Sequence, residues 1–408
     1  MNPVRWCRLS HGRVGRLPGL TLLSLSLLLA GCASDAREQA RPHLTGDPIA
    51  DGEENIAHGH PRERVLWQYR TALAAMRRGR NDVAKRELDD AIARISNIYG
   101  KDESARKARG YFAAEARKTF IGEPYERAMA YFYRGILYWM EGEPDNARAC
   151  FRSGQIMDSD TEEKSYAGDY VLFDYLDGYI TDRLKGDGSD AIKRAQAAAK
   201  VWKPPEFSPN ANVLVFVDYG RGPRKFATGQ YAEELRFKGG VSPEVSARVK
   251  AGELVGKAVP YDDLYFQATT RGGRAMDHIL GNKAVFKRTT DTAGTAAIIT
   301  GAAIGLGSRN REAQLAGLAL AGAGAVTKIF SGAATPAADI RMWDNLPLFL
   351  SFVALELPPG QHTLIIEFLD SRDQPLAGLT KTVNLTVPDG AGDKVVYVSD
   401  KSITPQTL

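Results

Sequence analysis

The chain has very few cysteines, and this scarcity excludes a disulfide-stapled scaffold. Only three occur in 408 residues, namely Cys7, Cys32 and Cys150. Cys7 lies in an N-terminal leader segment and Cys32 is the expected lipid attachment residue, which leaves Cys150 without a partner for an intrachain disulfide. Cys150 stands beside Phe151 on the apolar side of an expected helix. We therefore predict a buried structural thiol there rather than a nucleophile.

Sequence motifs that carry chemistry are also missing. The chain has no Gly-x-Ser-x-Gly, His-Glu-x-x-His, phosphate-binding loop or paired-cysteine motif. It has six histidines, and His58-Gly59-His60 could offer two metal ligands, but no third ligand accompanies them. The sequence thus predicts no catalytic residues, no metal and no cofactor, and it favours a protein that is not an enzyme.

Net charge is nearly absent once the leader is set aside. The whole chain carries 53 Lys and Arg against 49 Asp and Glu, and four of the arginines (Arg5, Arg8, Arg13 and Arg16) lie in a leader without acidic residues. The rest of the chain is neutral, so it lacks the basic surface of a nucleic-acid-binding protein. We expect no nucleic acid and no small-molecule substrate among its partners.

The leader ends in the tetrad Leu29-Ala30-Gly31-Cys32, which is typical of a bacterial lipoprotein. The apolar run Leu20 to Ala30 has the length of a signal peptide and is too short to span a bilayer. We expect residues 1–31 to be removed and Cys32 to carry the lipid; the alternative is an ordinary signal peptide that contains a cysteine. Because Ala33 rather than an Asp stands directly after Cys32, sorting rules favour the outer membrane, with the protein facing the periplasm.

Between the leader and the first regular pattern, residues 32–60 are polar and contain several glycines and prolines. Such a segment has too little apolar surface to offset the entropy of ordering. The sequence therefore predicts a flexible tether over residues 32–60.

Residues 61–205 have a helical pattern, and their best segment, residues 128–158, resembles a tetratricopeptide repeat. Gly142-Glu143-Pro144 supplies the turn, and Pro144 suits the first position of a helix. Weaker copies cover residues 67–95 and 170–201. Three helix pairs are about the minimum for a stable stack. The repeat positions of the best copy are filled by Tyr131, Gly135, Tyr138, Ala147, Phe151 and Gly154.

Aromatic residues are unusually dense in this helical segment. One hypothesis is that some of them line a groove that binds a protein partner through aromatic anchors. The alternative is that they pack between helices. The candidate partner-binding residues are Tyr125, Tyr131, Tyr133, Tyr138 and Trp139.

The remaining chain, residues 206–290 and 336–408, is rich in strand patterns and turns, which suggest a small antiparallel β-sandwich. The segment LPPGQHTLIIEF resembles the hairpin of PEGA-type sandwich modules. The expected strands cover residues 212–217, 231–237, 264–270, 349–357, 362–369, 379–387 and 395–399.

An Ala/Gly-rich segment, residues 291–335, interrupts these strands. Thr292 to Ser308 has no charge over 17 residues, and Ala313 to Thr327 has none over 15. Small residues recur four apart, which permits close helix–helix contact. We expect a helical hairpin packed on the sandwich; the alternatives are entry into a bilayer or membrane partner, and a mobile low-complexity insert. Each run is too short for a full span.

Three segments together resemble a poorly characterised family of Gram-negative tetratricopeptide-type lipoproteins. They are GEPYER leading into AMAYFYRG, then NVLVFVDYGRGP, and ADIRMWDNLP followed by LPPGQHTL. The resemblance implies an envelope lipoprotein with no assigned reaction. In the last segment, Asp339 and Arg341 can pair directly only if the backbone there is extended, since residues two apart share a face on a strand but not on a helix.

The sequence therefore predicts an α+β protein, with a tetratricopeptide-like helical domain followed by an interrupted β-sandwich. Its expected role is a protein–protein interaction scaffold in cell-envelope assembly. It would be anchored in the outer membrane by Cys32 and would bind envelope proteins through the helical repeats. The alternative is a secretion or pore-associated component that uses the Ala/Gly-rich hairpin at a membrane.

Overall fold

The computed structural model describes residues 44–99, 119–159, 168–270, 338–390 and 392–408. Residues 43–408 form one compact unit, distinct from residues 1–42. The expected signal peptide, Cys32 and the Ala/Gly-rich segment 291–335 lie outside the described residues. The boundary expected at residues 205 and 206 falls within the compact unit, where helices give way to strands.

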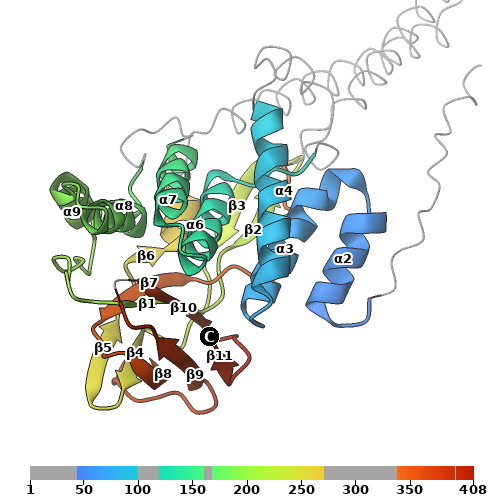
Figure 1. Ribbon diagram of the computed structural model, residues 1–408. Coiled ribbons are helices and arrows are strands. Elements are labelled where there is room, and N and C mark those ends of the chain that lie inside the picture. The colour runs from blue at the N-terminus through green and yellow to red at the C-terminus, as the bar shows by residue number, and fades with distance from the viewer. Residues whose placement is uncertain (1–43, 100–118, 160–167, 271–337, 391) are drawn as a thin grey trace, which may run out of the picture. The chain divides into compact units, whose positions relative to one another are not determined.

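The described part of the chain is mixed α and β, as the sequence predicts, and its helices come first (Figure 1). Adjoining pairs are α3 with α4, α6 with α7, and α8 with α9. The helices are α2 (Pro48–His58), a 3-10 turn (Pro61–Glu63), α3 (Arg64–Met76), α4 (Asn81–Tyr99), α6 (Pro124–Met140), α7 (Pro144–Asp158), α8 (Val171–Arg183), α9 (Ser189–Ala198) and α10 (Leu264–Thr269).

Local sequence explains the pair α6 and α7. Pro124 occupies the first turn of α6, and the side chain of Glu126 reaches back to the backbone N–H of Glu123 in a capping box. Gly142, with φ of +79°, makes the turn between the helices, a conformation that favours glycine. Gly135 faces the Phe151 ring so closely that an added Cβ would lie 2.7 Å from it.

The strands form two main sheets and one ribbon. One sheet has the order β10-β1-β7-β6, the second has the order β11-β9-β8-β4-β5, and β2 pairs with β3. The strands are β1 (Val213–Tyr219), β2 (Arg224–Thr228), β3 (Glu234–Lys238), β4 (Ser246–Ala251), β5 (Leu254–Ala258), β6 (Asp262–Asp263), β7 (Phe349–Leu355), β8 (Gly360–Leu369), β9 (Lys381–Val387), β10 (Lys394–Ser399) and β11 (Gln406–Thr407).

Strand β1 lies at the centre of the molecule and is buried along its whole length. Successive side chains of a strand point to opposite faces. Leu214 and Phe216 pack in one core with the helices, whereas Val213, Val215 and Val217 pack in another core with the second sheet. The molecule therefore has a helical layer, a middle sheet and an outer sheet (Figure 1).

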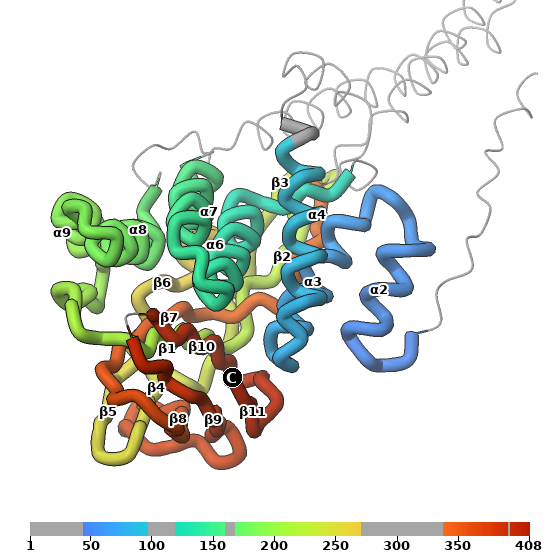
Figure 2. Tube along the Cα trace, viewed as in Figure 1, coloured from blue at the N-terminus to red at the C-terminus, as the bar shows by residue number. Residues whose placement is uncertain are grey.

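The expected all-antiparallel arrangement is wrong at two places. β1 pairs with β10 in parallel, and β9 pairs with β11 in parallel. Figure 2 shows β10 beside β1, although their colours mark them as far apart in the sequence. Only strands joined by a short turn are forced to run antiparallel. Because β1 and β10 are far apart in the sequence, turn signals did not fix their relative direction.

The strand expected over residues 264–270 is instead helix α10. The side chain of Asp263 accepts hydrogen bonds from the backbone N–H groups of Tyr265 and Phe266, at 2.8 and 3.4 Å. An aspartate at this position satisfies the first free N–H groups of a helix. This cap outweighs the strand preference of the aromatic residues that follow.

The tether expected over residues 32–60 is wrong for its second half, because residues 48–58 form α2. Asp47 caps this helix, Pro48 starts it, and the Asp51 carboxylate accepts hydrogen bonds from Thr45 and Gly46. Gly52 packs so closely on Thr71 of α3 that a Cβ there would overlap the threonine side chain. Packing against α3 stabilises a segment that composition alone does not predict to fold.

Candidate functional site

The three segments that resemble the lipoprotein family meet in a buried seam between the helices and the strands. Glu126 of α6 is fully buried, and its carboxylate accepts hydrogen bonds from the Lys225 Nζ at 2.5 Å and from the Trp343 backbone N–H at 2.7 Å. Lys225 of β2 is also buried and donates to the carbonyl oxygen of Arg341 at 3.0 Å. The pair joins three distant parts of the chain.

Burial dominates the electrostatics of this pair. Loss of hydration raises the pKa of Glu126, while the ammonium group of Lys225 and the N–H of Trp343 oppose that rise. A buried carboxylate is tolerated when a charge partner and further hydrogen bonds satisfy it. Glu126 has both a charge partner and further hydrogen bonds, so it holds α6, β2 and the segment around Trp343 together.

Trp343 fills the seam beside this ion pair. Its side chain is 1% exposed and stacks on Tyr69 of α3, with ring centroids 4.3 Å apart and an angle of 19° between the planes. Tyr133 of α6 lies 6.0 Å away from the same indole ring. Stacked aromatic pairs add to the energy of apolar burial. Trp343 thus connects two helices to the segment that precedes β7.

Arg341 pairs directly with Asp339, two residues earlier in the chain. Such a pair is expected where the backbone is extended. The Nη2 of Arg341 lies 2.6 Å from Oδ2 of Asp339, and no helix covers residues 338–343. Both side chains are mostly buried. The pair is a structural element of the seam.

A second buried polar cluster centres on Asp218, near the end of β1 and on the same face of the strand as Leu214 and Phe216. The hydroxyl groups of Tyr133 and Tyr397 both donate to Oδ2 of Asp218, at 2.8 and 2.7 Å. Arg77 of α3 places its Nη2 3.9 Å from Oδ1. Burial, and then the negative charge of Asp218, raise the pKa of both tyrosines well above the usual value, so they stay neutral donors.

Two neighbouring aspartates of β6 cap two different helices. Asp262 accepts hydrogen bonds from the backbone N–H groups of Val171 and Leu172, at 2.8 and 2.9 Å, and thereby caps α8. Asp263 points the other way and caps α10. Burial raises the pKa of Asp262 to about 7, against the two hydrogen bonds that lower it. The short strand β6 therefore ties the middle sheet to the helical layer.

The raised pKa of Asp262 predicts that the free energy of unfolding depends on pH. Because the pKa of Asp262 is raised in the folded state, that state binds the extra proton between about pH 4 and pH 7. The stabilising contribution is therefore complete below about pH 4 and is lost as the pH rises through 7. Compared with Asp262→Asn, the wild type should lose up to about 1.4 kcal/mol of unfolding free energy per pH unit in this window. Urea denaturation at several pH values measures it; parallel curves for the two proteins would contradict the assignment.

The described residues include open cavities but no cluster of metal-ligand side chains. Among them, no group of three or more His, Cys, Asp or Glu side chains could hold a metal ion. Two open cavities of about 440 and 350 Å³ occur: one lies beside β2 and β3, and the other lies beside Trp202 and β4. Within the described ranges, no helix has both the length and the apolarity to cross a membrane. Cys150 is buried, as expected, and burial raises the pKa of its thiol to about 11.

Three of the five candidate partner-binding aromatics are buried and cannot contact a partner, so the prediction is wrong for them. Tyr125, Tyr133 and Trp139 are at most 2% exposed, because their face of α6 packs against the strands. Trp139, for example, donates its indole N–H to Asp393 at 3.1 Å and contacts Phe216 of β1. Tyr131 and Tyr138 are half-buried, and the guanidinium of Arg134 lies 3.3 Å from the Tyr138 ring centre.

Comparison with known proteins adds no further identification. No protein-family model matches this chain, no curated protein matches it, and no solved structure matches it. The family resemblance therefore depends only on the three sequence segments, which the structure brings together at the seam.

Sequence reasoning missed most of the residues that build the seam. Lys225 follows the Gly-Pro end of the β1 motif and carries no local signal of its ion pair. Asp262 likewise caps a helix that lies about ninety residues earlier, at Val171. Only Asp263 had a readable signal, since an aspartate before an apolar run is a common helix start.

Proposed function

We propose that this protein is an outer-membrane lipoprotein that faces the periplasm and acts as a rigid, non-enzymatic adaptor in cell-envelope assembly. The buried seam is the observation that carries the proposal. It supports rigidity because Glu126, Asp218 and Asp262 each bind groups from other parts of the chain. Removing one partner of a buried charged pair is strongly destabilising, so such contacts hold distant parts of the chain together. The Cys32 motif supports the membrane anchor.

In this proposal the helix pairs are tetratricopeptide-like repeats, and the two sheets are a β-sandwich. Stacked repeats usually bind partners through their concave face. Here one face of the helical layer already packs on β1, β7 and β10 of the same chain. A partner would therefore bind the outer helical surface, where Tyr131 and Tyr138 lie seven residues apart on one side of α6.

The anchor is tested by the mass of the protein purified from membranes. We expect the mature chain to begin at Cys32 and to carry acyl groups, and we expect Cys32→Ala to abolish both the acylation and the outer-membrane location. A native mass that retains Met1 and lacks lipid would refute the anchor.

The adaptor role is tested by photo-crosslinking in intact cells. Photoreactive residues at Tyr131 and Tyr138 should both crosslink to the same envelope protein. The control position is Ile365 on the outer face of β8, which is 40% exposed. A photoreactive residue there should not crosslink to that envelope protein. If the products from helix and strand positions are the same, the helical surface has no special role and the proposal fails.

A further inference from the structure

Among the described residues, three arginines of the outer helical surface form ion pairs with only two carboxylates. Arg148 and Arg152 of α7 lie one turn apart and share one acceptor: both donate from Nε to Oδ1 of Asp177, at 2.8 Å each. Asp177 belongs to α8 and is buried. Arg194 of α9 approaches the other oxygen of Asp177 at 4.0 Å.

The charges of this cluster do not balance. Arg194 also pairs with Asp174, with Nη2 3.1 Å from Oδ1. Three guanidinium groups thus face two carboxylates, and among the described residues the Nη atoms of Arg148 and Arg152 have no hydrogen-bond acceptor. The Arg152 side chain is 55% exposed. Its two terminal nitrogens can therefore bind an incoming carboxylate without breaking an existing contact.

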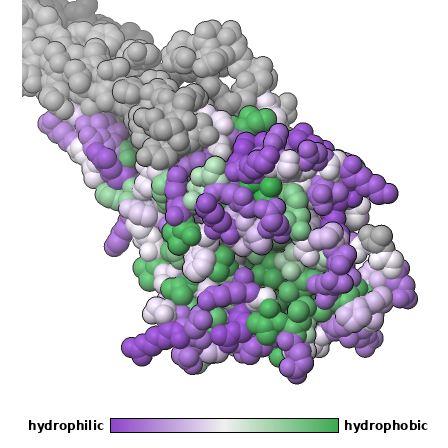
Figure 3. Space-filling view, turned by 90° about the vertical axis from the view of Figure 1, so that its left-hand side faces the viewer, coloured by the Kyte–Doolittle hydropathy of each residue, from purple (hydrophilic) through white to green (hydrophobic). Residues whose placement is uncertain are grey.

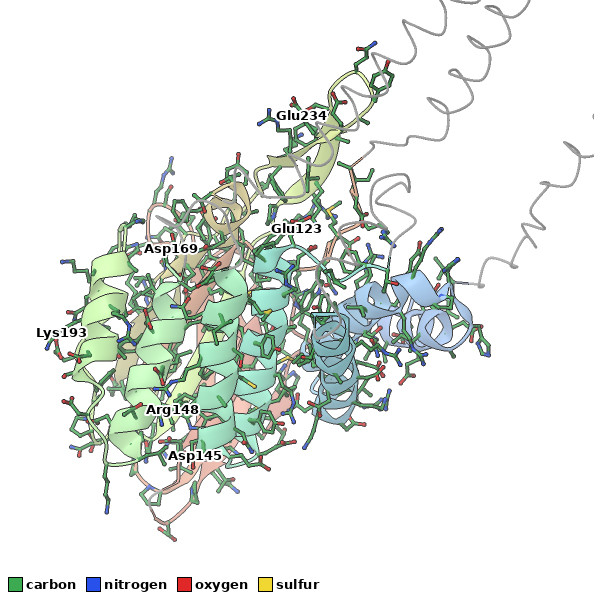
Figure 4. All side chains as sticks on the ribbon, turned by 90° about the horizontal axis from the view of Figure 1, so that it is seen from above. Glu123, Asp145, Arg148, Asp169, Lys193 and Glu234 are labelled. Carbon is green, nitrogen blue, oxygen red and sulfur yellow. The ribbon has the colours of Figure 1, made fainter. Side chains whose placement is uncertain are left out.

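An exposed apolar side chain, Ile156, lies on the same face of α7 as Arg148 and Arg152. Ile156 follows Arg152 by four residues, so the two side chains are neighbours on one face of the helix. Ile156 is 64% exposed, which is high for isoleucine in a described helix of this molecule. Asp145 lies on the same face of α7 in its first turn and is also exposed. Figure 4 shows Arg148 on the side of α7 that is next to α8.

Figure 3 gives a different face for comparison. It views the molecule from the side of α9 and β5 and shows apolar patches among hydrophilic residues. Trp202, which follows α9, and Leu254 and Val255 of β5 are exposed. The acids Asp370 and Asp373 line the cavity beside Trp202, and Lys257 pairs with Asp373. Two aspartates and one lysine line this cavity, and these side chains come from a strand and a separate loop rather than from one helix face. The α7 surface is the better-defined site.

We propose that Arg148, Arg152 and Ile156, together with Arg194, form a docking site for an acidic protein segment that also carries an apolar side chain. We call these four residues the α7 stripe. Guanidinium groups bind carboxylates through paired, charge-assisted hydrogen bonds. The apolar side chain of the partner would cover Ile156. This inference rests on the proposed adaptor function and names the chemistry of its partner.

The test measures binding of a labelled peptide of alternating Glu and Leu to the purified full chain in detergent. Fluorescence anisotropy gives the Kd. We expect Arg148→Gln with Arg152→Gln to raise the Kd by about tenfold, since two charge-assisted contacts are lost. We expect added salt to weaken the wild-type complex. A peptide of alternating Lys and Leu should not bind.

A matched double variant controls for general charge. Arg86→Gln with Arg94→Gln removes two arginines of α4 that are 56% and 40% exposed and pair with acids of their own. We expect its Kd to equal that of the wild type. Equal weakening in both double variants, or equal binding of the lysine peptide, would overturn the proposal.

The double arginine variant could weaken binding through a loss of folding, because Asp177 loses two partners in it. A second variant separates that effect from a loss of the docking site. Ile156→Glu changes an exposed residue and adds a repelling charge, and we expect it to weaken binding by a similar factor. Unchanged binding by this folded variant would also overturn the proposal. The peptide assay does not depend on acylation, so its failure is distinct from a failure of the membrane anchor.

Discussion

Replacing Lys225 with methionine is expected to lower the free energy of unfolding by about 3–5 kcal/mol. The substitution keeps an apolar chain of similar length but leaves the Glu126 carboxylate buried without its charge partner, which now lies at 2.5 Å. The Trp343 and Glu123 N–H groups remain bound to Glu126, so the loss reports mainly the missing ammonium group. Urea denaturation followed by circular dichroism measures it.

The matched control is Lys250→Met on β4. Lys250 also pairs with a glutamate, Glu367 at 2.8 Å, but its side chain is 35% exposed. Water replaces the lost partner there, so we expect a loss below about 1 kcal/mol. Burial raises the pKa of Glu126, so the Lys225→Met loss should also become smaller as the pH falls, because protonation of Glu126 removes the unpaired charge. Equal losses in the two methionine variants would show that the seam pair is not special.

Replacing Trp343 with alanine should cost about 3–5 kcal/mol of unfolding free energy. The indole ring is almost fully buried and stacks on Tyr69, which is itself fully buried, so its removal leaves a cavity between α3 and α6. The neighbouring rings are held by other contacts, which limits how far the site can collapse. Thermal and urea unfolding of the variant measure the loss.

Trp202→Ala is the control for this substitution. Trp202 is 45% exposed, in the loop after α9, so the same change in volume leaves little cavity. We expect a change within about 0.5 kcal/mol. If Trp202→Ala were as destabilising as Trp343→Ala, side-chain size rather than the seam would explain the effect.

Local pattern predicted the elements better than their assembly. The alternation of residues 363–368 indicated a strand with one buried face, and β8 has that pattern. The continuous apolar run of β1 was recognised as a strand, but the run itself reflects burial on both faces. The sequence has no marker that assigns one of those faces to the helices. The aromatic residues of α6 were therefore open to two interpretations, and for Tyr125, Tyr133 and Trp139 the packing alternative is correct.

The candidate site was harder to predict because its partners are distant in the sequence. The motifs around Glu126, Asp218 and Trp343 were noticed separately, yet nothing in their spacing showed that they meet. Lys225 and Asp262 gave no signal, since a buried charge is identified only by the partner that folding brings to it. The extended pairing of Asp339 with Arg341 was predictable because it depends only on local backbone geometry.

The position of β1 has a consequence for how the chain matures. Its parallel neighbour is β10, where Val213 aligns with Lys394, so the middle sheet is incomplete until β10 has been synthesised. Native contacts of such wide sequence separation form slowly. A nascent or truncated chain that stops before β10 would leave one edge of β1 open to other molecules, and such an edge invites aggregation. The middle sheet therefore reaches its native form only after β10 has joined β1.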